Sequence, residues 1–269
     1  MTIFYQRFVS FTASLLAVCI LIDGENLLSA DVAAVQRRGP FLVTHETSLE
    51  ACNEAIRHLE KIAHEIEALL GIRPRSDQLI QITLFSRDKN LQRFLAQEHP
   101  LFKGREAVYV RSPTGPRIFA ASGPSLVENL RHESVHAILH QHFPVVPLWL
   151  DEGLAEYFEA PFEESMRKDP HLDLVTKRAK RGDLPALAIL ETRNASETLS
   201  IQDYEASWAW IHFCLVGSTV RRNSFLTYLN DLKYGDPSST SLSLALGKEC
   251  SSKKLCDHIL TISKQIVTP

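Results

Sequence analysis

The residues best suited to chemistry lie in the stretch RHESVHAILHQH, Arg131 to His142, which holds four histidines and one glutamate. His132 and His136 are four residues apart, so a helix places both imidazoles on one face, where they can share a metal ion. Glu133 follows the first histidine and projects beside that face, within reach of a water molecule on the metal. The pattern is a complete HExxH motif, which predicts a zinc site with Glu133 as general base.

A catalytic zinc ion needs a third protein ligand and one open position for water. His142 stands six residues after His136, the spacing of the third metzincin histidine. That arrangement requires a glycine at position 139 to turn the chain back, and Leu139 is a good helix former instead. His140 shares the helix face of His136 but lies a further turn along, which is too far for the same ion. Both histidines are therefore weaker candidates than a carboxylate further along the chain.

Glu152 is the favoured third ligand, in the second stretch PLWLDEGLAEYFE, 147–159. It begins the next predicted helix, after a loop bounded by prolines that lets this helix fold back against the first. Glu156 is one turn further on the same face, where it can accept a hydrogen bond from a ligand histidine and fix its tautomer. Gly153 and Ala155 are small and would let two helix backbones pack closely.

The order of the predicted elements is strands first and helices later. Strands are expected at 41–46, 78–86 and twice within 106–122. Helices are expected at 48–71, 91–97, 125–142, from 151 onward, and at 162–168, 204–216, 224–235 and 256–267. This order favours an α+β fold, in which a small N-terminal mixed or antiparallel sheet with a helix packs on a mainly helical half that carries the zinc-binding helices. The strand-rich part would span 40–123 and the helical part 124–269.

The N-terminal residues are typical of a leader segment for export. Arg7 precedes an uncharged and mostly apolar run, 8–22, which suits the hydrophobic region of a signal peptide; an uncleaved membrane anchor is the alternative. We expect residues 1–30 to form this leader and 31–269 the catalytic domain. The protein would then be exported, as a periplasmic, secreted or outward-facing membrane-tethered protein.

Net charge and cysteine content give two further expectations, one about the class of partner and one about disulfides. The net charge of -3 gives no reason to expect a nucleic acid. Without the leader, four cysteines are left, and export permits disulfides. Cys250 and Cys256 are close in sequence and form the expected pair. Cys214 lies in an apolar helical run and is expected to be a small buried hydrophobe.

The two stretches HESVH and PLWLDEGLAEYFE together resemble the gluzincin metallopeptidases, and are most similar to the bacterial peptidase-MA-like group. That group has a helical HExxH followed by a W-L-x-E-G-x-A-E block. The resemblance implies that Glu152 is the third zinc ligand and that Glu156 is the second glutamate of the block. The stretch YEASWAWIHF resembles a downstream helix of the family, which implies that Tyr204 hydrogen-bonds the oxyanion. The resemblance covers about 41–235.

The sequence therefore predicts a zinc-dependent metallopeptidase with one Zn²⁺ per chain and a peptide or protein substrate. The alternative is an exported, non-catalytic zinc-binding or interaction domain on the same scaffold. Glu133 favours catalysis, because a structural zinc site needs no base and is closed by a fourth protein ligand. A zinc hydrolase that cuts other amides would use the same residues.

Overall fold

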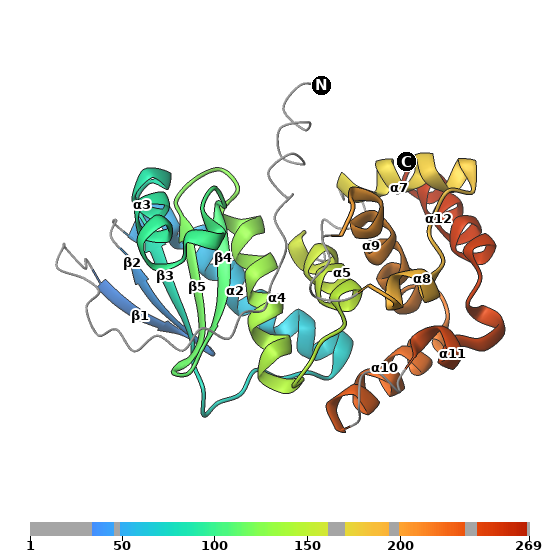
Figure 1. Ribbon diagram of the computed structural model, residues 1–269, viewed down its shortest axis with the longest axis horizontal. Coiled ribbons are helices and arrows are strands. Elements are labelled where there is room, and N and C mark those ends of the chain that lie inside the picture. Colours follow the sequence, from blue (N-terminus) through green and yellow to red (C-terminus); the bar gives the residue numbers. More distant parts are fainter. Residues whose placement is uncertain (1–33, 46–48, 161–169, 194–198, 235–240, 268–269) are drawn as a thin grey trace. The chain divides into compact units, whose positions relative to one another are not determined.

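The computed structural model describes residues 34–45, 49–160, 170–193, 199–234 and 241–267 (Figure 1). The predicted leader, 1–30, and the predicted helix at 162–168 lie outside these residues. The chain divides into two compact units, the first ending at Gln141 and the second beginning at His142. A mixed sheet in the first unit and helices in the second confirm the predicted α+β class. Among the helices of the described ranges, none has the length and apolar character needed to cross a membrane.

The first unit contains a five-stranded mixed sheet with the order β1-β2-β3-β5-β4. The central pairs β2–β3 and β3–β5 are parallel, and the outer pairs β1–β2 and β4–β5 are antiparallel. The strands are β1 (Ala34–Arg38), β2 (Phe41–His45), β3 (Ile80–Phe85), β4 (Ala107–Ser112) and β5 (Gly115–Ala121). All strands except β1 were predicted from the sequence. β1 carries little apolar signal because it is a polar edge strand, whose Val35 is 59% exposed.

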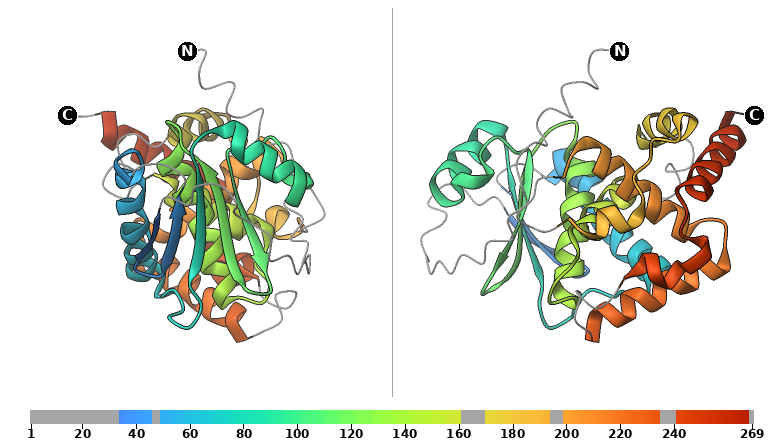
Figure 2. Two further views of the ribbon diagram at one scale, coloured as in Figure 1. Left: turned by 90° about the vertical axis from the view of Figure 1, so that its left-hand side faces the viewer. Right: turned by 45° about the vertical axis from the view of Figure 1, so that its right-hand side comes forward.

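Helices cover both faces of this sheet. Figure 2 shows α3 (Asp88–Glu98) on one side, and α2 (Leu49–Leu70) and α4 (Leu126–His142) on the other. The apolar residues of α2 recur at intervals of three and four, and this stripe is buried, as the sequence predicted. The α3 face is closed by an apolar cluster of Phe85, Leu91, Phe94, Leu95, Val108, Phe119 and Ala121. A 3-10 turn, η1 (Pro100–Phe102), follows α3.

The hairpin of β4 and β5 fixes which backbone groups face the edge of the sheet. Ser112 pairs with Gly115 across a two-residue connection, and the amide of Ala121 donates to the carbonyl of Glu106. Hydrogen-bonded positions alternate along an antiparallel strand, so the even-numbered residues of β4 bond to β5. The amide of Tyr109 therefore points away from β5, toward the edge.

The second unit is helical, with α9 (Ile201–Leu215) at its centre. α9 contacts α5, α7, α8, α10 and α12. It begins at Ser200, whose side chain forms a capping box with Asp203. The surrounding elements are α5 (Leu148–Glu159), α7 (Pro170–Arg181), α8 (Leu187–Glu191), α10 (Thr219–Tyr234), α11 (Leu242–Leu246), η3 (Gly247–Glu249) and α12 (Ser252–Val267). The sequence did not predict α7, α8 and α11, which are strongly polar or only five residues long.

The expectation of a Cys250–Cys256 disulfide is wrong. All four cysteines of the described residues are free thiols. Cys250 is partly exposed just before α12, whereas Cys256 is buried within that helix. Cys214 is fully buried in α9, as expected, and burial raises the pKa of its thiol to about 12.

Candidate metal centre

The HExxH motif lies on α4, which runs to His142 as predicted, ahead of Pro144 and Pro147. The helix is buried on all sides through its middle turns, so it belongs to the interior rather than to the surface. His132 is 6% exposed and His136 is 1% exposed. Their ring centroids are 5.0 Å apart, which places the two imidazoles side by side on one helix face. The predicted helical spacing of the two candidate ligands is thus present.

The carboxylate of Glu133 is bound to the edge of the sheet. The backbone amide of Tyr109 in β4 donates to Oε2 of Glu133 at 2.7 Å. The Tyr109 ring also contacts the rings of His136 and His140, at centroid distances of 6.4 Å and 5.2 Å. Tyr109 therefore positions the general-base candidate through its backbone and lines the histidine face through its side chain. No pattern in the sequence points to this residue, because the direction of its amide depends on strand pairing.

Arg131, which precedes the first histidine, anchors α4 to α2. Its side chain is fully buried, and its Nη2 lies 2.5 Å from Oε2 of Glu65, whose side chain is 19% exposed. A guanidinium is buried only at a large desolvation cost unless a carboxylate pairs with it. The ion pair consequently stabilises the position of α4 in the turn that carries His132.

Helix α5 carries buried carboxylates. This helix begins at Leu148 rather than near Asp151, because the carbonyl of Pro147 accepts hydrogen bonds from the amides of Leu150 and Asp151. Glu152 is 3% exposed and Glu156 is 7% exposed. Burying a carboxylate is costly unless it pairs with a cation or binds a metal.

Gly153 lets α5 and α9 approach closely, as its small size predicted. A Cβ atom added at Gly153 would lie 3.0 Å from the backbone of Ser207 in α9. This contact sets the position of α5 against α9 at Gly153, the residue that follows Glu152. Tyr204 lies on the same helix as Ser207, three residues earlier, and is half-buried. Its proposed contact with an oxyanion stays a prediction.

His171 in α7 is a polar neighbour of α5 that the sequence analysis did not identify. Its Nε2 lies 2.7 Å from Oε2 of Glu156 and 3.8 Å from Oε2 of Glu159. The His171 ring stacks on Trp208 of α9, with a centroid distance of 5.9 Å and an interplanar angle of 27°. Its helix follows a stretch of chain outside the described residues, and no sequence motif links it to α5.

Three of these side chains form a group that could hold a metal ion. His132, His136 and Glu152 each offer one ligand atom, and these atoms all lie within 4.8 Å of one another. All three residues are buried. A second group, defined in the same way, consists of His132, Glu156 and Glu159. Among the residues that the structure describes, His140 and His142 belong to no such group.

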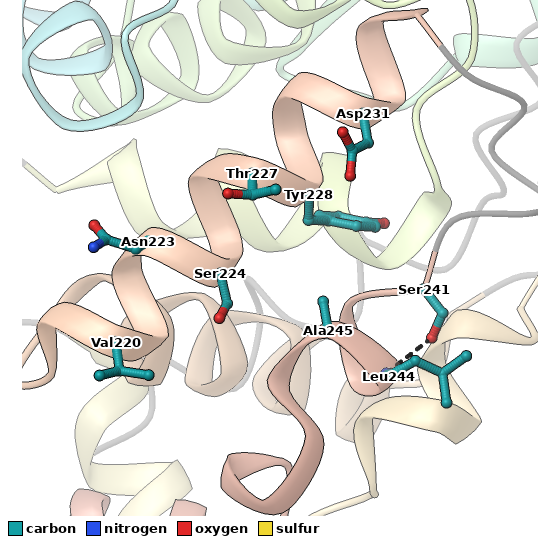
Figure 3. A pocket seen from close by; sticks show the side chains of 9 residues that line it. All are labelled: Val220, Asn223, Ser224, Thr227, Tyr228, Asp231, Ser241, Leu244 and Ala245. Atoms are coloured by element: carbon teal, nitrogen blue, oxygen red, sulfur yellow. Dashed lines mark hydrogen bonds between the residues drawn. The ribbon is translucent and has the colours of Figure 1, made fainter.

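A separate groove in the second unit has no comparable set of ligands (Figure 3). It has a volume of about 610 Å³ and lies along α10 and α11. Its lining residues are Val220, Asn223, Ser224, Thr227, Tyr228, Asp231, Ser241, Leu244 and Ala245. With one carboxylate and no histidine among them, these residues do not form a metal site.

Comparison of the chain with models of known protein families and with curated proteins gives no match. The gluzincin resemblance consequently rests on the two sequence stretches and on the buried group of His132, His136 and Glu152.

Proposed function

We propose that the protein is a zinc-dependent metallopeptidase, in which His132, His136 and Glu152 hold one zinc ion per chain. The observation that carries this proposal is their grouping: two buried imidazoles and one buried carboxylate, with ligand atoms within 4.8 Å of one another. Two histidines and one glutamate are a known ligand set of catalytic zinc, which keeps its fourth position open.

The residues present fit such an ion chemically. Zinc binds imidazole nitrogen and carboxylate oxygen at about 2.0–2.2 Å. A divalent cation would also offset the cost of burying Glu152, which is 3% exposed. Softer metals would favour thiolate ligands, and the group contains no cysteine.

Zinc in this site would supply Lewis-acid chemistry, which polarises a substrate carbonyl and acidifies a water molecule. Glu133 is the residue that moves the proton: it accepts a proton from the attacking water and delivers it to the leaving amine. The Tyr109 amide holds one oxygen of this carboxylate at 2.7 Å. This bond orients the carboxylate of Glu133, so that its second oxygen, Oε1, can take up the proton.

Two further residues complete the proposed mechanism. Glu156 would accept the ring N–H of a ligand histidine, and its grouping with His132 supports His132 as the partner. Tyr204 would hydrogen-bond the oxyanion, a role supported by the sequence resemblance and by its position on α9, the helix that contacts α5.

We further propose that the protein is exported and cuts peptides or proteins outside the cytoplasm, a proposal that rests on the apolar run at 8–22.

The first experiment measures the zinc content of the purified full-length chain beside its Glu152→Gln variant. We expect one zinc per wild-type chain and a much weakened affinity in the variant, because the amide cannot supply a negative charge. Zinc retained equally by the variant would reject Glu152 as a ligand. A wild-type chain without tightly bound zinc would reject the metal site.

The second experiment tests catalysis with fluorescently labelled casein and a peptide library, beside small amides. We expect the Glu133→Gln variant to keep its zinc and to lose activity by roughly 10²–10⁴-fold, since only the general base is removed. Zinc binding without hydrolysis of any of these substrates would favour the non-catalytic zinc-binding domain. Hydrolysis of small amides alone would favour an amidase.

A further inference from the structure

We propose that His171 is a positioning residue for the zinc site: it holds the carboxylate of Glu156, which in turn orients the ligand His132. This inference rests on the proposed zinc site and adds to it a residue that no sequence motif identifies. His171 lies on α7, outside both of the stretches that resemble the gluzincins.

The contact between His171 and Glu156 is short and protected from water. Nε2 of His171 lies 2.7 Å from Oε2 of Glu156, and both side chains are 8% exposed. The two atoms lie at ion-pair distance without the geometry of a regular hydrogen bond. Burial strengthens the attraction between polar groups that lie this close. The pair therefore fixes the carboxylate of Glu156 in one orientation.

The His171 ring is itself held in place. It stacks on Trp208, which is buried at the centre of the second unit. Its helix α7 is attached to α9 by an ion pair between Arg178 and Glu205, independently of His171. Helix α7 thus has this ion pair and buried apolar residues as attachments besides the His171–Glu156 contact.

A carboxylate has two oxygens, and the His171 contact engages only one of them. Glu156 also belongs to the group of ligand atoms that includes His132. Zinc-bound histidines commonly donate their second N–H to a carboxylate, and loss of that partner weakens metal binding by about 10–100-fold. Trp208 and α7 would thus hold His171, which would hold Glu156. Through Glu156 these contacts would restrain the orientation of the zinc ligand His132.

The experiment compares the zinc dissociation constants of full-length variants by competition with a chromophoric chelator. His171→Phe keeps an aromatic ring against Trp208 but removes the hydrogen-bond donor. We expect its zinc affinity to fall by roughly tenfold, the lower end of the effect of losing a partner that orients a ligand. His171→Gln retains a donor of similar reach and should restore most of the affinity.

His212→Phe is the matched control. His212 is also buried, and its ring contacts Trp208 at a centroid distance of 5.1 Å, but its hydrogen bond goes to His258. The same replacement on this side of Trp208 should leave zinc affinity unchanged. An equal loss in both variants would show a general packing effect and would overturn the proposal.

A double-mutant cycle tests the route through Glu156. In a Glu156→Gln background, His171→Phe should weaken zinc binding no further, because the link is already broken. Fully additive losses, or a His171→Phe variant with wild-type affinity, would overturn the role of His171 while leaving the zinc site intact. A wild-type chain that binds no zinc would instead overturn the proposed function itself.

Discussion

At the scale of single residues, the absence of a side chain at Gly153 determines how closely α5 and α9 pack. Replacing Gly153 by Ala would place a Cβ atom 3.0 Å from the Ser207 backbone. Overpacking of this kind costs about 1–3 kcal/mol, which outweighs the gain of about 1 kcal/mol that alanine brings to a helix. We expect a lower midpoint of urea unfolding for Gly153→Ala.

Gly123→Ala serves as the matched control for this substitution. Gly123 has an ordinary backbone conformation, and a Cβ atom added there meets nothing within 4 Å. The control should be as stable as the wild type or slightly more so, because alanine restricts the unfolded chain. If both variants lose stability equally, the close approach at Gly153 is not the cause.

The buried ion pair of Glu65 and Arg131 gives a second prediction at the scale of single residues. Glu65→Leu removes the carboxylate that pairs with the fully buried Arg131, which should cost about 3–5 kcal/mol of the free energy of unfolding. Combining it with Arg131→Met removes the buried charge as well and should recover most of the loss. The exposed pair of Arg75 and Asp77 is the comparison, and Asp77→Asn should change stability by less than about 1 kcal/mol. Urea unfolding of these three variants beside the wild type measures all of these effects.

At the scale of elements, the edge strand β4 takes part in the site through its backbone. Tyr109→Pro deletes the amide that binds Glu133, but spares the ladder with β5 because this amide points to the edge. We expect the variant to retain zinc and to lose casein-hydrolysing activity by about 10- to 150-fold, since one neutral-donor bond to a charged acceptor contributes about 1.5–3 kcal/mol.

The control for the edge strand is Arg111→Pro, two residues further along β4 and therefore on the same side of the ladder. It imposes a similar backbone restriction without touching Glu133. Equal activity losses in the two variants would mean that strand distortion, rather than the lost amide, impairs hydrolysis. Tyr109→Ala separates the contribution of the side chain, because it keeps the amide.

At the scale of the whole molecule, acid should destabilise the fold through two histidines in the second unit. Nδ1 of His212 lies 3.1 Å from Nε2 of His258. Burial, and then the neighbouring His258, lower the pKa of His212 to about 3; burial, and then Arg221, lower that of His258 to about 4. Both pKa values in the folded protein lie below the unfolded value of about 6.5.

The sign of the effect follows from this order. Between pH 6.5 and about 4 the unfolded chain takes up protons at these histidines and the folded chain does not. Stability is therefore complete above pH 6.5 and falls as the pH decreases, by up to about 1.4 kcal/mol per pH unit for each imidazole. Urea unfolding at several pH values, with a chelator present to remove metal effects, measures the slope. Replacing both histidines by glutamine should flatten it.

The sequence predicted the elements whose own residues carry a strong pattern. The apolar stripe of α2, and the two prolines that follow α4, were visible without a structure. β1 and α7 were not, because their residues are mostly polar and they are stabilised by what they pack against.

The same distinction holds within the candidate site. His132, His136 and Glu152 could be selected by spacing and chemistry. Tyr109 depends on strand pairing, and His171 on helix packing between residues fifteen positions apart in sequence, as its contact with Glu156 shows. Long-range contacts of this kind leave no local periodicity in a single sequence.

Trp208 lies against two imidazole rings, those of His171 and His212. A protonated imidazole quenches the fluorescence of an adjacent indole far more than a neutral one does. The emission of Trp208 should therefore dim when His212 takes up a proton in acid, so the protein contains its own optical reporter. Replacing Trp149 and Trp210 by phenylalanine would isolate this signal, so that events around α9 could be followed in real time without a dye.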